Sequence, residues 1–125
     1  MKQIISTPNA PQAIGPYSQA VEANGFVFIS GQIPINPANG QIPEGIEAQT
    51  EQVMRNIGSI LEAAGLTYAN VVKTTVLLQN IADFGTMNGI YAKYFTADCP
   101  ARAAFEVSAL PKGALIEVEV IAARN

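Results

Sequence analysis

Two side chains near the C-terminus have the types and spacing for chemistry on a small anion. Arg102 and Glu117 lie in two alternating stretches, ARAAFEV (101–107) and LIEVEVIA (115–122), which predict two strands joined by a Pro-Lys-Gly turn. If the strands are neighbours, the alternation turns both side chains toward the same face. A guanidinium binds a carboxylate through two parallel hydrogen bonds, and a second carboxylate can activate a water molecule. The pair therefore predicts a site for a small anionic substrate.

The same spacing also fits a cross-strand salt bridge between Arg102 and Glu117 that has no function. Structural ion pairs produce constellations of this kind as well. The residues alone leave both interpretations open. Glu119, two positions further along the same strand, is interpreted as an ordinary charge.

Length and composition indicate the number of domains and the kinds of partner that the chain can have. A chain of 125 residues suits a single domain, 1–125, with one core. Hydrophobic residues make up 49% and charged residues only 14%, which is a small charged share for a monomer, so we expect surface buried against further copies of the chain. The net charge is −3, and the seven Lys and Arg residues are scattered, which argues against binding to nucleic acid.

The chain has one cysteine, Cys99, and no histidine. A disulfide within the chain is excluded, and a Ser-His or Cys-His nucleophile is impossible. Zinc and haem sites lack their usual ligands, so we expect no metal and no cofactor. Neither a signal peptide nor a membrane span is visible, and we expect a cytoplasmic protein.

The elements that must position these side chains follow from periodicity. Asn24-Gly25 between two apolar runs predicts a hairpin of Ala20–Ala23 and Phe26–Ser30. A rhythm of 3.6 residues predicts a helix over Ile46–Ala64, and a second helix is expected from Asp83 to about Phe95. A β-branched run predicts a strand over 71–79. We therefore expect an α+β sandwich with two helices on one face of a mixed sheet. The other face is predicted to be a subunit interface with polar pockets, which hold Arg102, Glu117, Glu119, Lys73, Thr75 and Leu77.

Six further positions could belong to a site or support one. The Pro- and Gly-rich segment 8–20 must be held by its side chains, and Ile14, Tyr17 and Ser18 are the candidates. On sequence alone Tyr17 is interpreted as a plug whose hydroxyl bonds a carbonyl. Ser30-Gly31 ends a strand where a ligand can approach closely. Asn88 lies on an apolar helix face and needs partners, which are either a neighbouring loop or a ligand-lining segment.

Several motifs, spread over essentially the whole chain, resemble those of the Rid (YjgF) family. They occur in order and at the spacing of the family. They are AIGPYSQA (13–20), FISGQIP (28–34), LEAAG (61–65), VVKTTV (71–76), NxxYxxYF (88–95), PARAAFEV (100–107) and LPKGALIEVEVIA (110–122).

The resemblance implies a chorismate-mutase-like (bacillus-type) sandwich that assembles as a homotrimer, with a site in each cleft between subunits. It implies hydrolysis of 2-imino acids, or of their 2-enamine tautomers, to 2-oxo acids and ammonia. The substrates would be 2-iminobutanoate and 2-iminopropanoate, which arise from threonine and serine dehydration. By the same resemblance, Arg102 holds the carboxylate and Glu117 positions the water, and the other site residues are Tyr17, Ser30, Gly31 and Asn88.

One position departs from the family pattern. Many members have cysteine two residues after the arginine, whereas this chain has Ala104, and Cys99 precedes the arginine. Properties of the family that depend on that thiol are not expected here, and Cys99 is interpreted as an inert thiol. Two other functions remain as alternatives, namely a regulatory module that binds a 2-oxo acid without turnover, and an RNA-directed inhibitor of translation.

Overall fold

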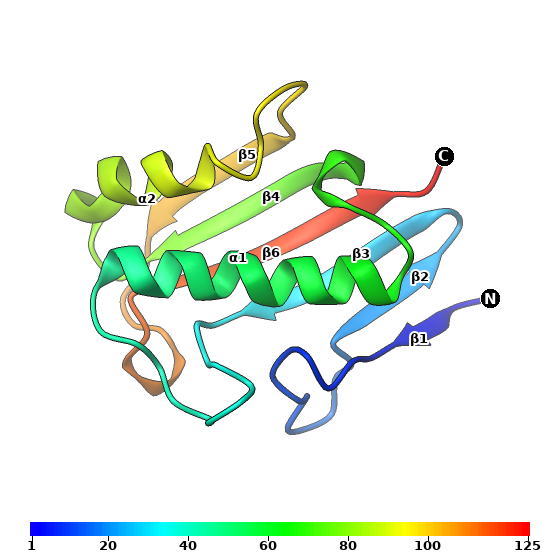
Figure 1. The fold of residues 1–125 in the computed structure, drawn as a ribbon, viewed down its shortest axis with the longest axis horizontal. Helices are drawn as coiled ribbons and strands as arrows, with labels where there is room; N and C mark the ends of the chain where they lie inside the picture. Colours follow the sequence, from blue (N-terminus) through cyan, green and yellow to red (C-terminus); the bar gives the residue numbers. More distant parts are fainter.

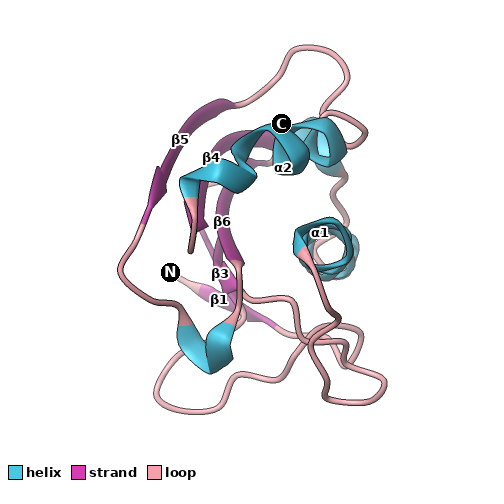
Figure 2. Ribbon diagram, turned by 90° about the vertical axis from the view of Figure 1, so that its left-hand side faces the viewer, coloured by secondary structure: helices cyan, strands magenta, loops and turns pink.

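A mixed sheet of six strands forms one layer of the computed structural model, which describes residues 1–125, and two helices cover one of its faces (Figures 1 and 2). The helices are α1 (Ile46–Ala63) and α2 (Phe84–Tyr91). The strands are β1 (Gln3–Ile5), β2 (Ala20–Ala23), β3 (Phe26–Gln32), β4 (Val71–Leu78), β5 (Ala101–Glu106) and β6 (Ile116–Ala123). The predicted α+β architecture, with both helices on one side of a mixed sheet, is confirmed.

The order of the strands corrects the prediction for the C-terminal third. The sheet runs β1-β2-β3-β6-β4-β5, so β5 and β6 are not a hairpin. Strand β4 lies between them, paired in parallel with β5 and antiparallel with β6. The chain from β4 to β5 passes through α2, which is the kind of crossover that parallel strands need. The Pro-Lys-Gly stretch is part of a longer connection over residues 107–115 that carries the chain past β4.

The hairpin of β2 and β3 forms as predicted. Asn24 and Gly25 both have positive φ, 51° and 81°, which is the geometry of a two-residue type I′ turn. Asparagine and glycine enter this region at low cost, so the turn fixes the register that pairs Ala23 with Phe26. Strand β3 then carries Val27 and Ile29 into the core.

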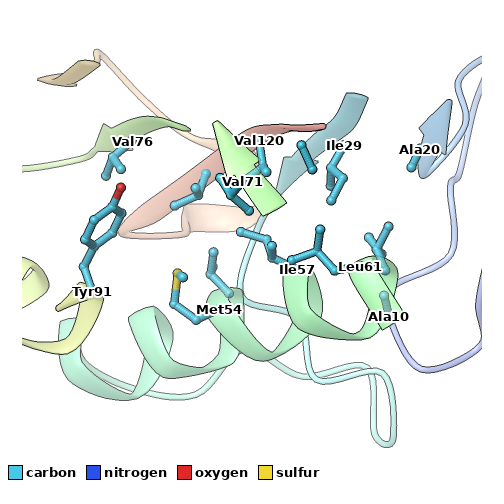
Figure 3. Close-up of a cluster of buried hydrophobic side chains, with 14 of the residues drawn as sticks. Ala10, Ala20, Ile29, Met54, Ile57, Leu61, Val71, Val76, Tyr91 and Val120 are labelled. Carbon is cyan, nitrogen blue, oxygen red and sulfur yellow. The ribbon is translucent and has the colours of Figure 1, made fainter. Parts of the chain in front are cut away.

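The apolar stripe of α1 packs against the sheet (Figure 3). Val53, Ile57 and Leu61 are each 0% exposed. Two amides on the same helix are buried as well. Asn56 donates to the carbonyls of Ile33 and Ile35, at 3.3 and 3.0 Å. Gln49 accepts from the Leu115 N–H at 2.8 Å and donates to the Pro43 carbonyl at 3.0 Å.

Strand β4 carries an irregularity that the alternating pattern did not predict. Its pairing with β6 shifts between Val71 and Lys73, so Val71 is buried and Val72 is 43% exposed. After the shift, alternation returns, and Thr74 and Val76 face the helices. The Thr74 hydroxyl shares a 2.8 Å hydrogen bond with the Tyr91 hydroxyl of α2. Helix α2 ends at Tyr91, earlier than expected, and Asp83 makes no capping bond with its side chain.

The segment before β2 is held by a residue that the sequence did not single out. The Gln19 side chain is 3% exposed. It accepts from the Thr7 N–H at 2.7 Å and donates to the carbonyls of Thr7, Ala10 and Pro11. By contrast, Ile14 is 83% and Tyr17 is 54% exposed, and the Tyr17 hydroxyl makes no hydrogen bond within the chain. The interpretation of Tyr17 as a structural plug is therefore wrong for the single chain.

We predict that Gln19→Ala lowers stability by about 2 kcal/mol, because it leaves a buried N–H and buried carbonyls without their partner. Thermal unfolding followed by circular dichroism measures the change. Gln12→Ala is the matched control, since that exposed amide makes one bond of 3.3 Å to the same segment. Equal losses for the two variants would show that Gln19 is not the anchor.

Candidate active site

Glu117 lies on the face of the sheet that no helix covers. Its neighbours on β6, Ile116 and Val118, are buried under the helices, and alternation turns Glu117 the opposite way. The carboxylate lies directly over Gly31, so closely that a Cβ at residue 31 would overlap Oε2. The pairing of β3 with β6 shifts between Ile29 and Gln32, which places Gly31 within a bulge. The absence of a side chain at Gly31 thus makes room for the Glu117 carboxylate, whereas the sequence predicted the close approach of a ligand.

The surroundings of Glu117 favour the protonated form of its carboxyl group. Partial burial raises the pKa of Glu117 above its usual value, and the neighbouring carboxylate of Glu119 raises it further. A carboxylate with a raised pKa is a better proton acceptor near neutrality than an ordinary one. Glu119 is exposed, which agrees with its interpretation as an ordinary charge that acts on the site only through its field.

Tyr17 and Gly31 share a hollow with Glu117. The hollow measures about 460 Å³, and its walls come from the segment before β2, the loop after β3 and the turn before β6. It is lined by Pro11, Gln12, Ile14, Tyr17, Gln19, Gly31, Gln32, Ile33, Ile35, Pro111, Lys112 and Glu117. The structure thus brings three of the predicted site residues together.

Ser30 holds the wall of this hollow instead of lining it. Its hydroxyl donates to the Ser18 carbonyl at 2.6 Å, and its N–H donates to the Gln19 carbonyl at 2.9 Å. These two bonds attach the end of β3 to the segment that carries Tyr17. In the single chain, Ser30 is therefore a positioning residue.

Arg102 belongs to a different hollow, on the helix side of the sheet. Its guanidinium lies 4.8 Å from the centre of the Tyr91 ring and 5.3 Å from that of Phe84. Its Nη1 donates to Asn88 Oδ1 at 2.6 Å. Stacking and the hydrogen bond fix the direction of the side chain. The partner of Asn88 is thus the arginine itself, and neither a loop nor a ligand segment is needed to satisfy it.

The hollow around Arg102 measures about 400 Å³, and it is lined by Asn88, Tyr91, Ala92, Phe95, Cys99, Pro100 and Arg102. Cys99 is exposed there, and its Sγ lies 3.4 Å from the Phe95 carbonyl oxygen. Ala104 is half-buried and packs against the core.

Arg102 and Glu117 point to opposite faces of one sheet, which corrects the prediction that they face the same way. In the parallel pairing Arg102 lies beside Thr74, which is buried under α2. Glu117 lies beside Leu77 on the open face. The alternative of a cross-strand salt bridge is wrong for the same reason. The two ion pairs in the chain are Lys93–Glu51 and Arg124–Glu22.

Sequence reasoning missed several residues of the two hollows. The sequence assigned no role in the site to Phe84 and Tyr91, although their rings flank Arg102. Ile33, Ile35 and Lys112 line the Glu117 hollow. The Pro-Gly flanks of Lys112 signalled a turn, and nothing in them indicated where its side chain lies.

The chain has neither a metal-binding cluster nor a membrane-spanning helix. No cluster of three or more His, Cys, Asp or Glu side chains is placed to hold a metal ion. Neither helix combines the length and apolar character needed to cross a membrane.

Comparison with known proteins covers nearly the whole chain. Residues 7–124 match the family described as Endoribonuclease L-PSP. A mouse protein named 2-iminobutanoate/2-iminopropanoate deaminase is 50% identical over 100% of this chain and 93% of its own length. A Lactococcus lactis protein described as a proposed regulator, AldR, is 54% identical over 96% of each chain. The crystal structure of a Rid protein of unknown function from Yersinia pestis has a TM-score of 0.96 and 54% identity, over 98% of this chain and 99% of that one. Because both sequence and fold match over almost its full length, the chain belongs to the Rid (YjgF) family.

Proposed function

We propose that the protein hydrolyses 2-imino acids, such as 2-iminobutanoate and 2-iminopropanoate, to 2-oxo acids and ammonia. The relative named for this activity supports the proposal, since it is 50% identical over the whole chain. The observation that carries it in this chain is the partly buried carboxylate of Glu117, which lies over Gly31 in a hollow shared with Tyr17.

The chemistry matches these groups. An imine carbon is already electrophilic, so the reaction needs neither a metal nor a covalent nucleophile. Glu117 as a carboxylate accepts a proton from water while the oxygen forms a bond to C2 of the protonated imine, and the C=N π electrons move to nitrogen. Glu117 then gives this proton to the amine nitrogen of the carbinolamine. As the C–N bond breaks, the C2 hydroxyl loses its proton to Glu117 and becomes the 2-oxo group, and Glu117 passes that proton to the departing ammonia, which leaves as ammonium. Arg102 binds the substrate carboxylate, and Tyr17 closes the hollow over the reacting atoms.

We infer that the complete site forms between copies of the chain, in a homotrimer with the chorismate-mutase-like arrangement. Within one chain the sheet separates Arg102 from Glu117, so one substrate cannot touch both. The helix-free face also exposes large apolar side chains, Phe28 at 45% and Phe105 at 48%. Apolar surface of this kind suits a permanent interface between subunits.

The direct test makes the imines in situ with a threonine or serine dehydratase and follows release of the 2-oxo acid. We expect clear acceleration over buffer. Glu117→Gln and Arg102→Ala should each lower kcat/KM at least 100-fold, because one loses the proton acceptor and the other the carboxylate anchor. Glu119→Gln is the matched control and should stay within a few-fold of wild type. A fully active Arg102→Ala variant would contradict the assigned roles.

The shared site makes a second prediction that depends on assembly. We expect Arg102→Ala and Glu117→Gln subunits each to be inactive alone. When equal amounts are mixed, unfolded together and refolded, the mixture should regain about a quarter of wild-type activity. A cleft is active only if one subunit supplies an intact Arg102 and its neighbour an intact Glu117, and each condition is met in half of the clefts. Co-refolding either variant with itself is the control. If the mixture stays inactive while its sedimentation matches a native trimer, the site does not lie between copies.

We also predict that Gly31→Ala removes activity while leaving the fold intact. The new methyl group displaces the Glu117 carboxylate, which is the end of a flexible side chain, so the backbone need not move. The loss in kcat should exceed about tenfold, with little change in melting temperature. Gly85→Ala is the control, because nothing lies within 4 Å of a Cβ there. A wild-type rate for Gly31→Ala would mean that the position of the Glu117 carboxylate is unimportant.

A regulatory function without turnover is the second candidate, and the similarity to the proposed regulator AldR favours it. It requires the same hollows, so the residues do not separate it from catalysis. Binding of 2-oxobutanoate, followed by calorimetry beside the hydrolysis assay, distinguishes the two. Tight binding with no acceleration of hydrolysis would favour regulation.

The family description also raises ribonuclease activity. The chain carries a net charge of −3 and has no histidine to act as a general acid or base. Its seven basic residues form no continuous track for a phosphate backbone. These features favour a small-molecule substrate over RNA.

A further inference from the structure

The Glu117 hollow is larger than the smallest proposed substrates require. It measures about 460 Å³. A four-carbon 2-imino acid has seven non-hydrogen atoms and needs on the order of 200 Å³, if each water-sized group takes roughly 30 Å³. Space therefore remains beyond the reacting atoms. Ile14, Ile33 and Ile35 give part of this space apolar walls, against which methylene groups can pack.

Lys112 supplies the only positive charge among the residues that line this hollow. Its side chain is exposed and makes no ion pair or hydrogen bond with the rest of the chain. Glu117 is the only acidic residue of the same lining. One part of the hollow thus has a proton acceptor, and another part has an unpaired ammonium group.

The backbone at Lys112 adds an independent observation. Its φ and ψ are 57° and 25°, which is the left-handed region that glycine and asparagine enter most easily. A lysine in this region carries backbone strain that a glycine would avoid, and the residue that follows, Gly113, is a glycine. Strain of this kind is retained where a particular side chain is needed. The turn also ends at Ala114, which is 0% exposed, so the backbone is buried two residues after Lys112.

We propose that the protein also accepts dicarboxylic 2-imino acids, with four or five carbons, and that Lys112 binds the carboxylate farther from the imine. The inference rests on the proposed function. Arg102 of a second copy binds the carboxylate next to the imine, Glu117 activates water, and the methylene groups contact the isoleucine wall. Lys112 is then a specificity-determining residue, because a substrate with one carboxylate leaves it unused.

The test compares imines made in situ by amino-acid oxidases from aspartate, glutamate and alanine. Wild type should hydrolyse 2-iminosuccinate and 2-iminoglutarate with kcat/KM at least equal to that for 2-iminopropanoate. Lys112→Gln should lower kcat/KM for the two dicarboxylic imines about tenfold, as expected for loss of a charged hydrogen bond. It should change kcat/KM for 2-iminopropanoate less than twofold. Lys112→Arg should restore most of the loss. Lys2→Gln, which removes the same charge far along the chain, should leave all three values unchanged.

The outcomes separate this proposal from the function on which it rests. If wild type hydrolyses 2-iminopropanoate but not the dicarboxylic imines, the Lys112 proposal fails and the deaminase function stands. It fails in the same way if Lys112→Gln changes all three substrates equally. If wild type accelerates none of them, both proposals fall. Titration with 2-oxoglutarate and 2-oxobutanoate, followed by NMR, gives a second readout, since Lys112→Gln should weaken binding of the first ligand alone.

Discussion

The position of β6 between β3 and β4 is the constraint on which the candidate site depends. Because β6 pairs antiparallel with both, its alternation is fixed from two sides, and Glu117 has no freedom to face the helices. The same placement moves β5 to the edge, where it pairs only with β4. Arg102 is then free to stack on α2. A single feature of topology thus directs the two charged groups to opposite sides of the sheet.

The separation of Arg102 and Glu117 by the sheet gives a physical reason for the small share of charged residues. A chain with 14% charged residues exposes Phe26, Phe28 and Phe105 at the sheet face instead of covering it with a third helix. If Arg102 and Glu117 act on one substrate, as proposed above, a partner surface is needed, and the same apolar face offers one. In the proposed assembly, one surface would both join the copies and bring the two half-sites together.

The features that sequence predicted best are those fixed locally. Asn24-Gly25 fixes a turn by itself, and the 3.6-residue stripe of α1 locates the helix to within a residue at its end. Close approach at Gly31 was also predictable, although the group that approaches is the Glu117 side chain and not the ligand that the sequence suggested. Of the six site residues that motif similarity predicted, the structure brings Tyr17, Gly31 and Glu117 into one hollow and Asn88 and Arg102 into another.

The failures concern pairing between distant segments. Alternation shows that Arg102 and Glu117 lie on strands, but it does not show which strand lies between them, and one intervening strand reversed the conclusion about their faces. The bulge at Val71–Lys73 likewise has no local signal in a uniform β-branched run. Gln19 was missed because its four bonds depend on how the segment folds back, and a glutamine in a loop looks the same whether buried or solvated.

The two buried amides of α1 have a consequence for how the hollow can change during evolution. Asn56 fixes the loop after β3 and Gln49 fixes the start of β6, so two walls are tied to one rigid helix. The third wall is anchored only near its ends, by Gln19 at Pro11 and by Ser30 at Ser18. Residues 13–17 form a short bridge between these anchors. Substitutions in that bridge can reshape the cavity without disturbing the core, so relatives with different substrates should differ there first.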